Sequence, residues 1–294
     1  MNTFEFFRFR FHLRALDAVE FPRVSANAIR GALGALLGAN TPPDAARRLF
    51  TPGAALGPSP SGLADWPRPF VLRTGRLDGA VLRAGDGFFF DVHLFDGCIA
   101  MFSHMRNAFE QFATRGIGPG RGRAELARIE QLDTEDRAEP VSGAPGLPCV
   151  VSLEPGPETA ARVCVRFLTP TELKCKGRLA AQPEFPVLFG RLRDRLSTLR
   201  ALYGAGSLEI DFRGMGERAA AVRLVRAELA WEEIRRRSAR TGQVHPLGGF
   251  TGIAEYEGPL TEFLPWLRAA RWAGVGRQTV WGKGEVRVDK ADRE

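Results

Sequence analysis

The chain has 294 residues, of which 44% are hydrophobic, which is enough for two domains with ordinary cores. Its formal net charge is +7 and its pI is about 9.8, a balance that favours polyanionic partners. No apolar run approaches the ~18 residues that a membrane span needs, and the alternating N-terminus is unlike a signal peptide, so we expect a cytoplasmic protein with no membrane partner.

The first half begins with a strand. Residues 7–15 alternate strictly between apolar and polar side chains, which predicts one apolar face and one face carrying Arg8, Arg10, His12 and Arg14. The later elements are, in chain order, a helix over 24–38, a loop over about 51–69, strands near 70–77 and 87–95, a helix over 99–114, a glycine-rich basic loop over 115–123 and a last segment ending near Leu132. This gives the order β-α-β-β-α-β.

The second half repeats that order after a Pro/Gly linker at 140–148. Its predicted elements are a strand over 162–168, a helix over 184–203, strands over 222–231 and 249–256, a helix over 260–272 that Pro265 kinks or delays, and a glycine-rich loop and strand over 273–288. We therefore expect an α+β protein of two tandem ferredoxin-like (RRM-like) βαββαβ domains, residues 1–142 and 149–294, each with one sheet face free of helices.

Each half has a glycine-rich loop directly after an amphipathic helix. Glycine allows positive φ and close backbone approach, so successive N–H groups can converge on an anion. A dinucleotide-binding loop would instead follow a strand and open a helix, which argues against that class of site. The residues predicted to bind RNA are Arg121 and Arg123 in the first loop, and Gly274, Gly276, Arg277, Gly282, Lys283 and Gly284 in the second.

The four cysteines carry no motif. Cys98, Cys149, Cys164 and Cys175 form no CxxC pair and have no metal-ligand spacing. We expect reduced and mostly buried thiols. The carboxylates likewise show no paired arrangement typical of a metal nuclease, so the sequence predicts neither a metal site nor another cofactor.

Several segments resemble the CRISPR repeat-processing endoribonucleases of the RAMP superfamily. GVGRQTVWGKGEV (274–286) looks like the family's C-terminal glycine-rich signature, and LGGFTGIAEYEGPLTEFLPWLRAARW (247–272) looks like the strand and helix before it. FLTPTELKCKGRL (167–179), RGALGALL (30–37) and RGIGPGRGR (115–123) are also similar to family segments. The resemblance covers most of the chain and is most specific in its C-terminal part.

The resemblance implies a metal-independent endoribonuclease that binds CRISPR repeat RNA and cuts precursor transcripts within the repeats. In that chemistry the 2′-hydroxyl attacks the scissile phosphate and leaves a 2′,3′-cyclic phosphate and a 5′-hydroxyl. It requires a base, an acid and positive charge near the phosphorane. Other CRISPR effector subunits are further candidate partners.

The histidine that many family members carry in or just after the first helix is missing, because residues 24–38 contain none. The candidate catalytic residues are therefore His245, in a polar loop, His12, on the polar strand face, and the lysines of the similar segment, Lys174 and Lys176. A solvated turn is an equally good interpretation of the lysines. His93, in the apolar segment FFFDVHLF, and His104 are expected to be structural.

Two other functions stay open on the sequence alone. One is a non-catalytic RAMP subunit that binds guide RNA in an effector complex, which the missing helix histidine favours. The other, less favoured, is an enzyme for a small anionic ligand, which would use the same glycine-rich loops.

Overall fold

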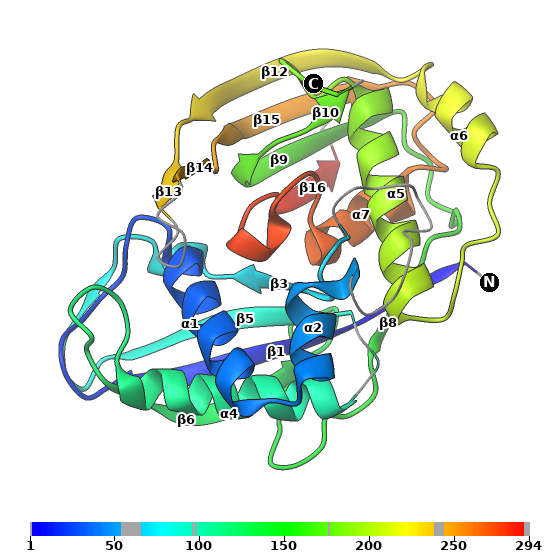
Figure 1. Cartoon of the computed structure of the whole chain (residues 1–294). Helices are drawn as coiled ribbons and strands as arrows, with labels where there is room; N and C mark the ends of the chain where they lie inside the picture. Colours follow the sequence, from blue (N-terminus) through cyan, green and yellow to red (C-terminus); the bar gives the residue numbers. More distant parts are fainter. Residues whose placement is uncertain are drawn as a thin grey trace.

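The computed structural model (Figure 1) describes residues 2–53, 66–95, 97, 99–175, 177–237 and 244–290. The elements of the first half are β1 (Thr3–Ala15), β2 (Val19–Glu20), α1 (Ser25–Asn40), α2 (Pro43–Phe50), β3 (Phe70–Arg73), the 3₁₀ turn η1 (Gly75–Leu77), β4 (Val81–Leu82), β5 (Gly87–Leu94), α4 (Ile99–Arg115), β6 (Ala124–Leu132), β7 (Ala138–Pro140) and β8 (Cys149–Ser152). The elements of the second half are β9 (Arg162–Thr171), β10 (Lys174–Cys175), β11 (Arg178–Leu179), α5 (Phe185–Tyr203), α6 (Phe212–Ala219), β12 (Arg223–Glu232), β13 (Arg235–Arg237), β14 (Val244–Pro246), β15 (Gly249–Glu257), α7 (Leu264–Ala273), the 3₁₀ turn η2 (Thr279–Trp281) and β16 (Val286–Lys290).

The α+β class and the repeated order of long elements agree with the sequence. Helix α2 and the short strands are additions that the sequence analysis did not predict, and most of the loop predicted over 51–69 lies outside the described residues. No helix in the described part of the chain combines the length and apolar content that crossing a membrane requires.

The first sheet has the strand order β3-β5-β1-β6-β7, with antiparallel neighbours, and α1 and α4 cover one of its faces (Figure 1). The alternation predicted for β1 is confirmed. Its odd-numbered apolar residues, Phe7, Phe9, Phe11 and Leu13, are buried against these helices in the first core.

The second sheet has the order β12-β15-β9-β16, also antiparallel, with α5 and α7 on one face (Figure 1). The helix predicted over 260–272 begins late, at Leu264, with Pro265 in its first turn. A proline fits there because the N–H it lacks would have no partner inside the helix.

The polar face of β1 is not open along its whole length, contrary to the sequence prediction. The strand begins earlier than predicted, and its residues Phe4 and Phe6 are buried in the core of the second half. Strand β8 also pairs with this first part of β1, from Thr3 opposite Ser152 onward. Only the later part of the face remains accessible.

Each basic side chain on that face of β1 has an acidic neighbour. The pairs are Arg8–Asp136, Arg10–Asp91, His12–Glu130 and Arg14–Glu125. The side chain of Arg8, next to the second half, is 4% exposed, whereas that of Arg14 at the far end of the strand is 58% exposed. The second half therefore covers the start of the face and leaves its end to solvent.

In the described part of the chain the cysteines are free thiols, as expected, but most of them are only partly buried, contrary to the expectation. Cys149, Cys164 and Cys175 are free thiols, and Cys164 is buried. Burial raises the pKa of the Cys149 and Cys164 thiols, which keeps them protonated and unreactive. Cys98 lies outside the described residues.

Candidate nucleic-acid interface

The second glycine-rich loop joins α7 to β16 and lies between the two halves (Figure 1). Its four glycines all have positive φ: Gly274, Gly276, Gly282 and Gly284. A Cβ atom on Gly284 would lie 2.0 Å from the carbonyl oxygen of Val275. These glycines therefore allow the loop to pack closely against its own chain. The motif alone suggests instead that they allow a ligand to come close to the backbone.

The first glycine-rich loop is built in the same way. A Cβ atom on Gly118 would lie 1.9 Å from the carbonyl oxygen of Glu20. Of the two arginines predicted to bind RNA there, Arg121 is exposed, whereas Arg123 is 2.7 Å from Asp17 in an exposed ion pair. This loop offers solvent-facing positive charge but does not line the pocket of the second loop.

Glu172 is the anchor of the second loop, and the sequence analysis did not single it out. Its carboxylate accepts a bond of 2.6 Å from Arg277, and its main-chain oxygen accepts one from the backbone N–H of Arg277. The carboxylate is also 3.7 Å from Lys283. The signal was available, because Glu172 is the one acid among the basic residues of segment 167–179.

Lys283 is buried, so the prediction that it contacts RNA directly does not fit the structure. Its ammonium, on a side chain only 3% exposed, donates to the carbonyl oxygen of Gly248 and to the side chain of Gln278. Burial lowers its pKa to about 8, an effect that the Glu172 carboxylate opposes. Lys283 therefore supports the loop from inside, and Arg277, with a 43% exposed side chain, is the cation that the loop presents.

Lys174 and Arg277 line one pocket. This cavity of about 370 Å³ lies beside the second loop, and its other cationic lining residues are Arg68, Arg191 and Arg195. Lys174 forms no ion pair within the described residues. Lys176 lies outside them. The structure thus brings one predicted lysine to the predicted loop.

The strand that carries His245 also reaches this loop. His245 pairs with Arg236 in the β13–β14 hairpin, and the next residue, Pro246, accepts a hydrogen bond of 3.2 Å from the side chain of Gln278. The backbone of His245 is therefore placed next to the loop; its side chain lies outside what the structure describes.

His12 lies away from the pocket beside the second loop. It lies on β1, its Nε2 is 2.6 Å from Glu130 Oε2, and its ring contacts Phe89 with centroids 5.5 Å apart. Because it is on the first sheet, it does not share a pocket with Lys174 or Arg277. The four candidate catalytic residues are thus not one cluster.

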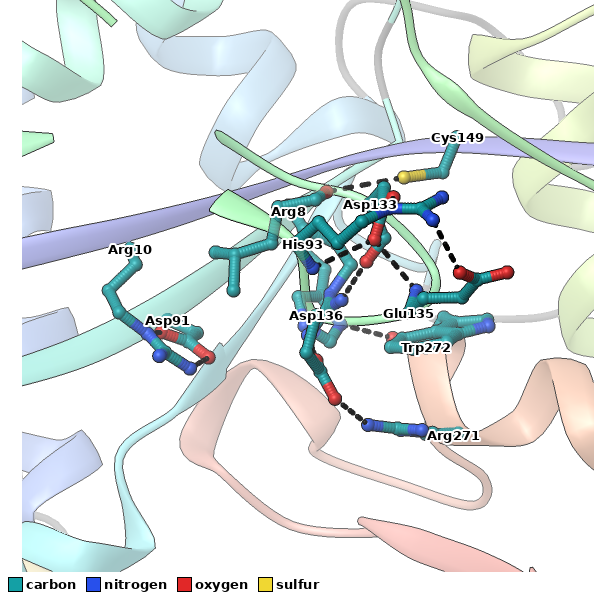
Figure 2. Close-up of polar contacts among 12 residues, drawn as sticks. Arg8, Arg10, Asp91, His93, Asp133, Glu135, Asp136, Cys149, Arg271 and Trp272 are labelled. Carbon is teal, nitrogen blue, oxygen red and sulfur yellow. Dashed lines mark hydrogen bonds and ion pairs between the residues drawn. The ribbon is translucent and has the colours of Figure 1, made fainter. Parts of the chain in front are cut away.

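A cleft of about 660 Å³ separates the outer face of the first sheet from α7 and β16. Asp136, one of its lining residues, bridges Arg8 of the first half and Arg271 of the second at 2.6 and 2.9 Å (Figure 2). Both guanidinium groups also lie 4.4 Å from the centre of the Trp272 ring. Arg10, Arg73, Arg76 and Arg287 line the same cleft, together with the carboxylates of Asp78, Asp91, Glu232 and Glu285. Its walls therefore carry charges of both signs, with arginines in slight excess.

The carboxyl end of α7 is held by donors from outside the helix. His93 Nδ1 donates to the carbonyl oxygen of Trp272 at 2.9 Å (Figure 2), and Arg73 and Arg195 donate to the two neighbouring carbonyl groups. Burial, reinforced by nearby arginines, lowers the pKa of His93 well below its usual value, so the ring is neutral. The prediction of a structural His93 is confirmed.

Comparison with known proteins identifies the molecule. Residues 165–286, which include Glu172, Lys174 and the second loop, match the family model described as CRISPR-associated endoribonuclease Cas6. The second half of the chain therefore belongs to the Cas6 family. Residues 4–146 match a second family model, described as an N-terminal domain. Among curated proteins, none is significantly similar.

Solved Cas6 structures share this fold. A Cas6 product complex has 19% sequence identity, covers 96% of this chain and 98% of its own, and gives a TM-score of 0.60. Thermus thermophilus Cas6 also has 19% identity, covers 97% and 98%, and gives 0.55. In a partial Cas6-RT-Cas1–Cas2 complex, 98% of this chain matches 46% of a longer chain at 15% identity and a TM-score of 0.60.

Helix α1 touches the second loop. The guanidinium of Arg30 lies 3.6 Å from the centre of the Trp281 ring, and a Cβ atom on Gly282 would lie 2.9 Å from that of Ala26. The helix that lacks the expected histidine and the glycine-rich loop therefore form one surface across the two halves.

Proposed function

We propose that this Cas6-family protein binds CRISPR repeat RNA and cleaves precursor transcripts within the repeats. The observation that carries the proposal is the family match over residues 165–286, because this segment contains Glu172, Lys174, Arg277 and the loop that they build. In the cleft next to that loop, Arg76 and Arg287 form no ion pair within the described residues, and such cations supply the electrostatic attraction that an RNA backbone requires.

We further infer that both halves are ferredoxin-like domains, with a boundary in the segment 143–148. The strand orders β3-β5-β1-β6 and β12-β15-β9-β16 support this inference, since a split βαβ unit places its first and third strands in the middle of the sheet. Strand β8 then links the two domains, because it follows the boundary in sequence and pairs with β1 of the first domain.

For the chemistry, we propose attack by the 2′-hydroxyl without a metal ion, giving a 2′,3′-cyclic phosphate and a 5′-hydroxyl. We assign to Lys174 the stabilisation of the negative charge of the phosphorane. This role is supported by its position in the loop pocket without a carboxylate partner in the described chain. His245 is the proposed acid or base, with Lys176 as a second cation. His12, oriented by Glu130, is the alternative histidine.

Arg287 offers the clearest test of phosphate contacts in the cleft. It is exposed on β16, lines the cleft and forms no ion pair within the described residues. We expect Arg287→Ala to weaken repeat RNA binding and to reduce the slope of log K against log salt by about 1. Filter binding or fluorescence anisotropy over a series of salt concentrations measures both.

Arg213→Ala is the matched control for that test. Arg213 sits on α6 with a 91% exposed side chain and outside the cleft, so its removal changes the net charge equally. An identical loss of affinity in both variants would mean that only the overall charge matters, and would remove Arg287 from the proposed contacts.

One observation favours a second function, a subunit that binds guide RNA without cutting it. Helix α1 contacts the glycine-rich loop but carries no histidine there. A protein of this kind would bind the repeat tightly and leave it intact. It could also assemble with other CRISPR proteins, as the printed name of the Cas6-RT-Cas1–Cas2 complex describes for that relative.

A further inference from the structure

Trp231 is an exposed aromatic side chain next to the glycine-rich loop, with 50% of its surface accessible. It lies on β12, the edge strand of the second sheet, directly opposite Phe250 of β15. Residues directly opposite in an antiparallel pair project from the same face. Phe250 is buried in the core on that face, so Trp231 continues the apolar face out into solvent.

Close packing fixes one part of the indole. A Cβ atom on Gly248 would lie 3.3 Å from the Trp231 Nε1 atom and 3.5 Å from its Cζ2 atom, so the ring rests against the glycine backbone. A ring held in this way loses little conformational entropy when a second planar group stacks on it. An aromatic side chain that moves freely on the surface would lose more conformational entropy on stacking than Trp231 does.

The pocket in front of the ring combines apolar surface with positive charge. It has a volume of about 310 Å³, and Trp231 shares it with Leu179, which is 53% exposed, and with Lys174 and Arg277. Two carboxylates also line it: Glu172 pairs with Arg277 at 2.6 Å, and Glu233 disfavours a phosphate on its own side. Apolar surface beside Lys174, which forms no ion pair within the described residues, fits a nucleobase whose flanking phosphate lies toward that lysine.

We propose that Trp231 is the stacking platform for one unpaired nucleobase of the bound RNA. The inference rests on the proposed function and deepens it, because it assigns a base-recognition position beside the loop. Stacking on an aromatic ring accepts any base, so the position fixes the path of the strand more than its sequence.

The test combines protein variants with RNA that lacks single bases. Repeat RNAs carrying one abasic nucleotide at each position in turn are bound to the full-length protein and to Trp231→Ala. We expect Trp231→Ala to weaken binding of the intact repeat by roughly 10- to 100-fold. One abasic position should weaken the wild type by a similar factor and cause no further loss in the variant.

Two further variants keep the result interpretable. Trp231→Phe retains an aromatic ring and should recover most of the affinity, whereas Phe212→Ala removes the other exposed aromatic of the described chain, on α6, and should bind like the wild type. Circular dichroism of each variant checks that it is folded.

The outcomes separate this inference from the function on which it rests. Suppose that the wild type binds the repeat, and that each abasic substitution lowers the affinity of Trp231→Ala as much as that of the wild type. Trp231 is then not a stacking platform, while the proposed RNA binding stands. Equal affinity of Trp231→Ala and wild type for the intact repeat would also overturn the inference about Trp231. If the wild type does not bind the repeat at all, the proposed function itself fails.

Discussion

Replacing Glu172 with alanine is expected to lower the free energy of unfolding by about 3–5 kcal/mol. The substitution removes the carboxylate that faces Arg277 and Lys283, and the Lys283 side chain is only 3% exposed. A buried ammonium without its acidic neighbour is far more costly than an exposed ion that loses a partner. Urea unfolding followed by circular dichroism measures the difference.

Glu217→Ala is the control for this prediction. Glu217 pairs with Arg213 on α6, and both side chains are mostly exposed, so its loss should cost less than about 0.5 kcal/mol. The double variant Glu172→Ala/Lys283→Met should recover part of the lost stability, because it removes the unpaired charge as well. An unfolding free energy for Glu172→Ala within 1 kcal/mol of the wild type, measured as described, would show that the carboxylate does not anchor the loop.

Gly284→Ala should have the second large effect, on the shape of the loop itself. Gly284 has a φ of +69°, and an added Cβ atom would lie 2.0 Å from the carbonyl oxygen of Val275. Positive φ costs an L-residue about 1–2 kcal/mol, and the clash with backbone adds to that cost. We expect a loss of at least about 2 kcal/mol in stability and more than about tenfold in repeat RNA affinity, measured by urea unfolding and anisotropy.

Gly143→Ala provides the matched glycine substitution. Gly143 lies in the linker, its φ is not positive, and a Cβ atom there meets nothing within 4 Å, so stability and RNA affinity should stay unchanged. If Gly284→Ala also behaved like the wild type, the loop would tolerate a different backbone and would not be a rigid part of the interface.

The sequence predicts the elements of this fold well where the pattern is local. The alternation in β1 identifies both of its faces, and Pro265 places the start of α7. Local pattern cannot show that the second half covers the start of β1, because Phe4 and Phe6 find their partners far away in the chain. For the same reason, the sequence alone does not reveal the partners of Arg8 and predicts an exposed side chain there.

The sequence predicts where the candidate site lies better than it predicts what each of its residues does. The repeated glycines point to the correct loop, but the reason for each glycine is a contact with backbone elsewhere, which no spacing reveals. Lys283 and Arg277 are six residues apart in one motif, yet one is buried and the other half-exposed. Burial depends on the packing of the whole chain, so motif membership alone does not distinguish a structural cation from one that meets RNA.

Single-turnover cleavage, in EDTA, of the CRISPR repeat RNA from the protein's own genome tests the proposed function most directly. A matched RNA carries a 2′-deoxy sugar just upstream of the cut. We expect the natural RNA to be cut once within the repeat, with a 2′,3′-cyclic phosphate end, and the deoxy RNA to survive. Tight binding of an RNA that stays whole, or cleavage of the deoxy RNA, would contradict it.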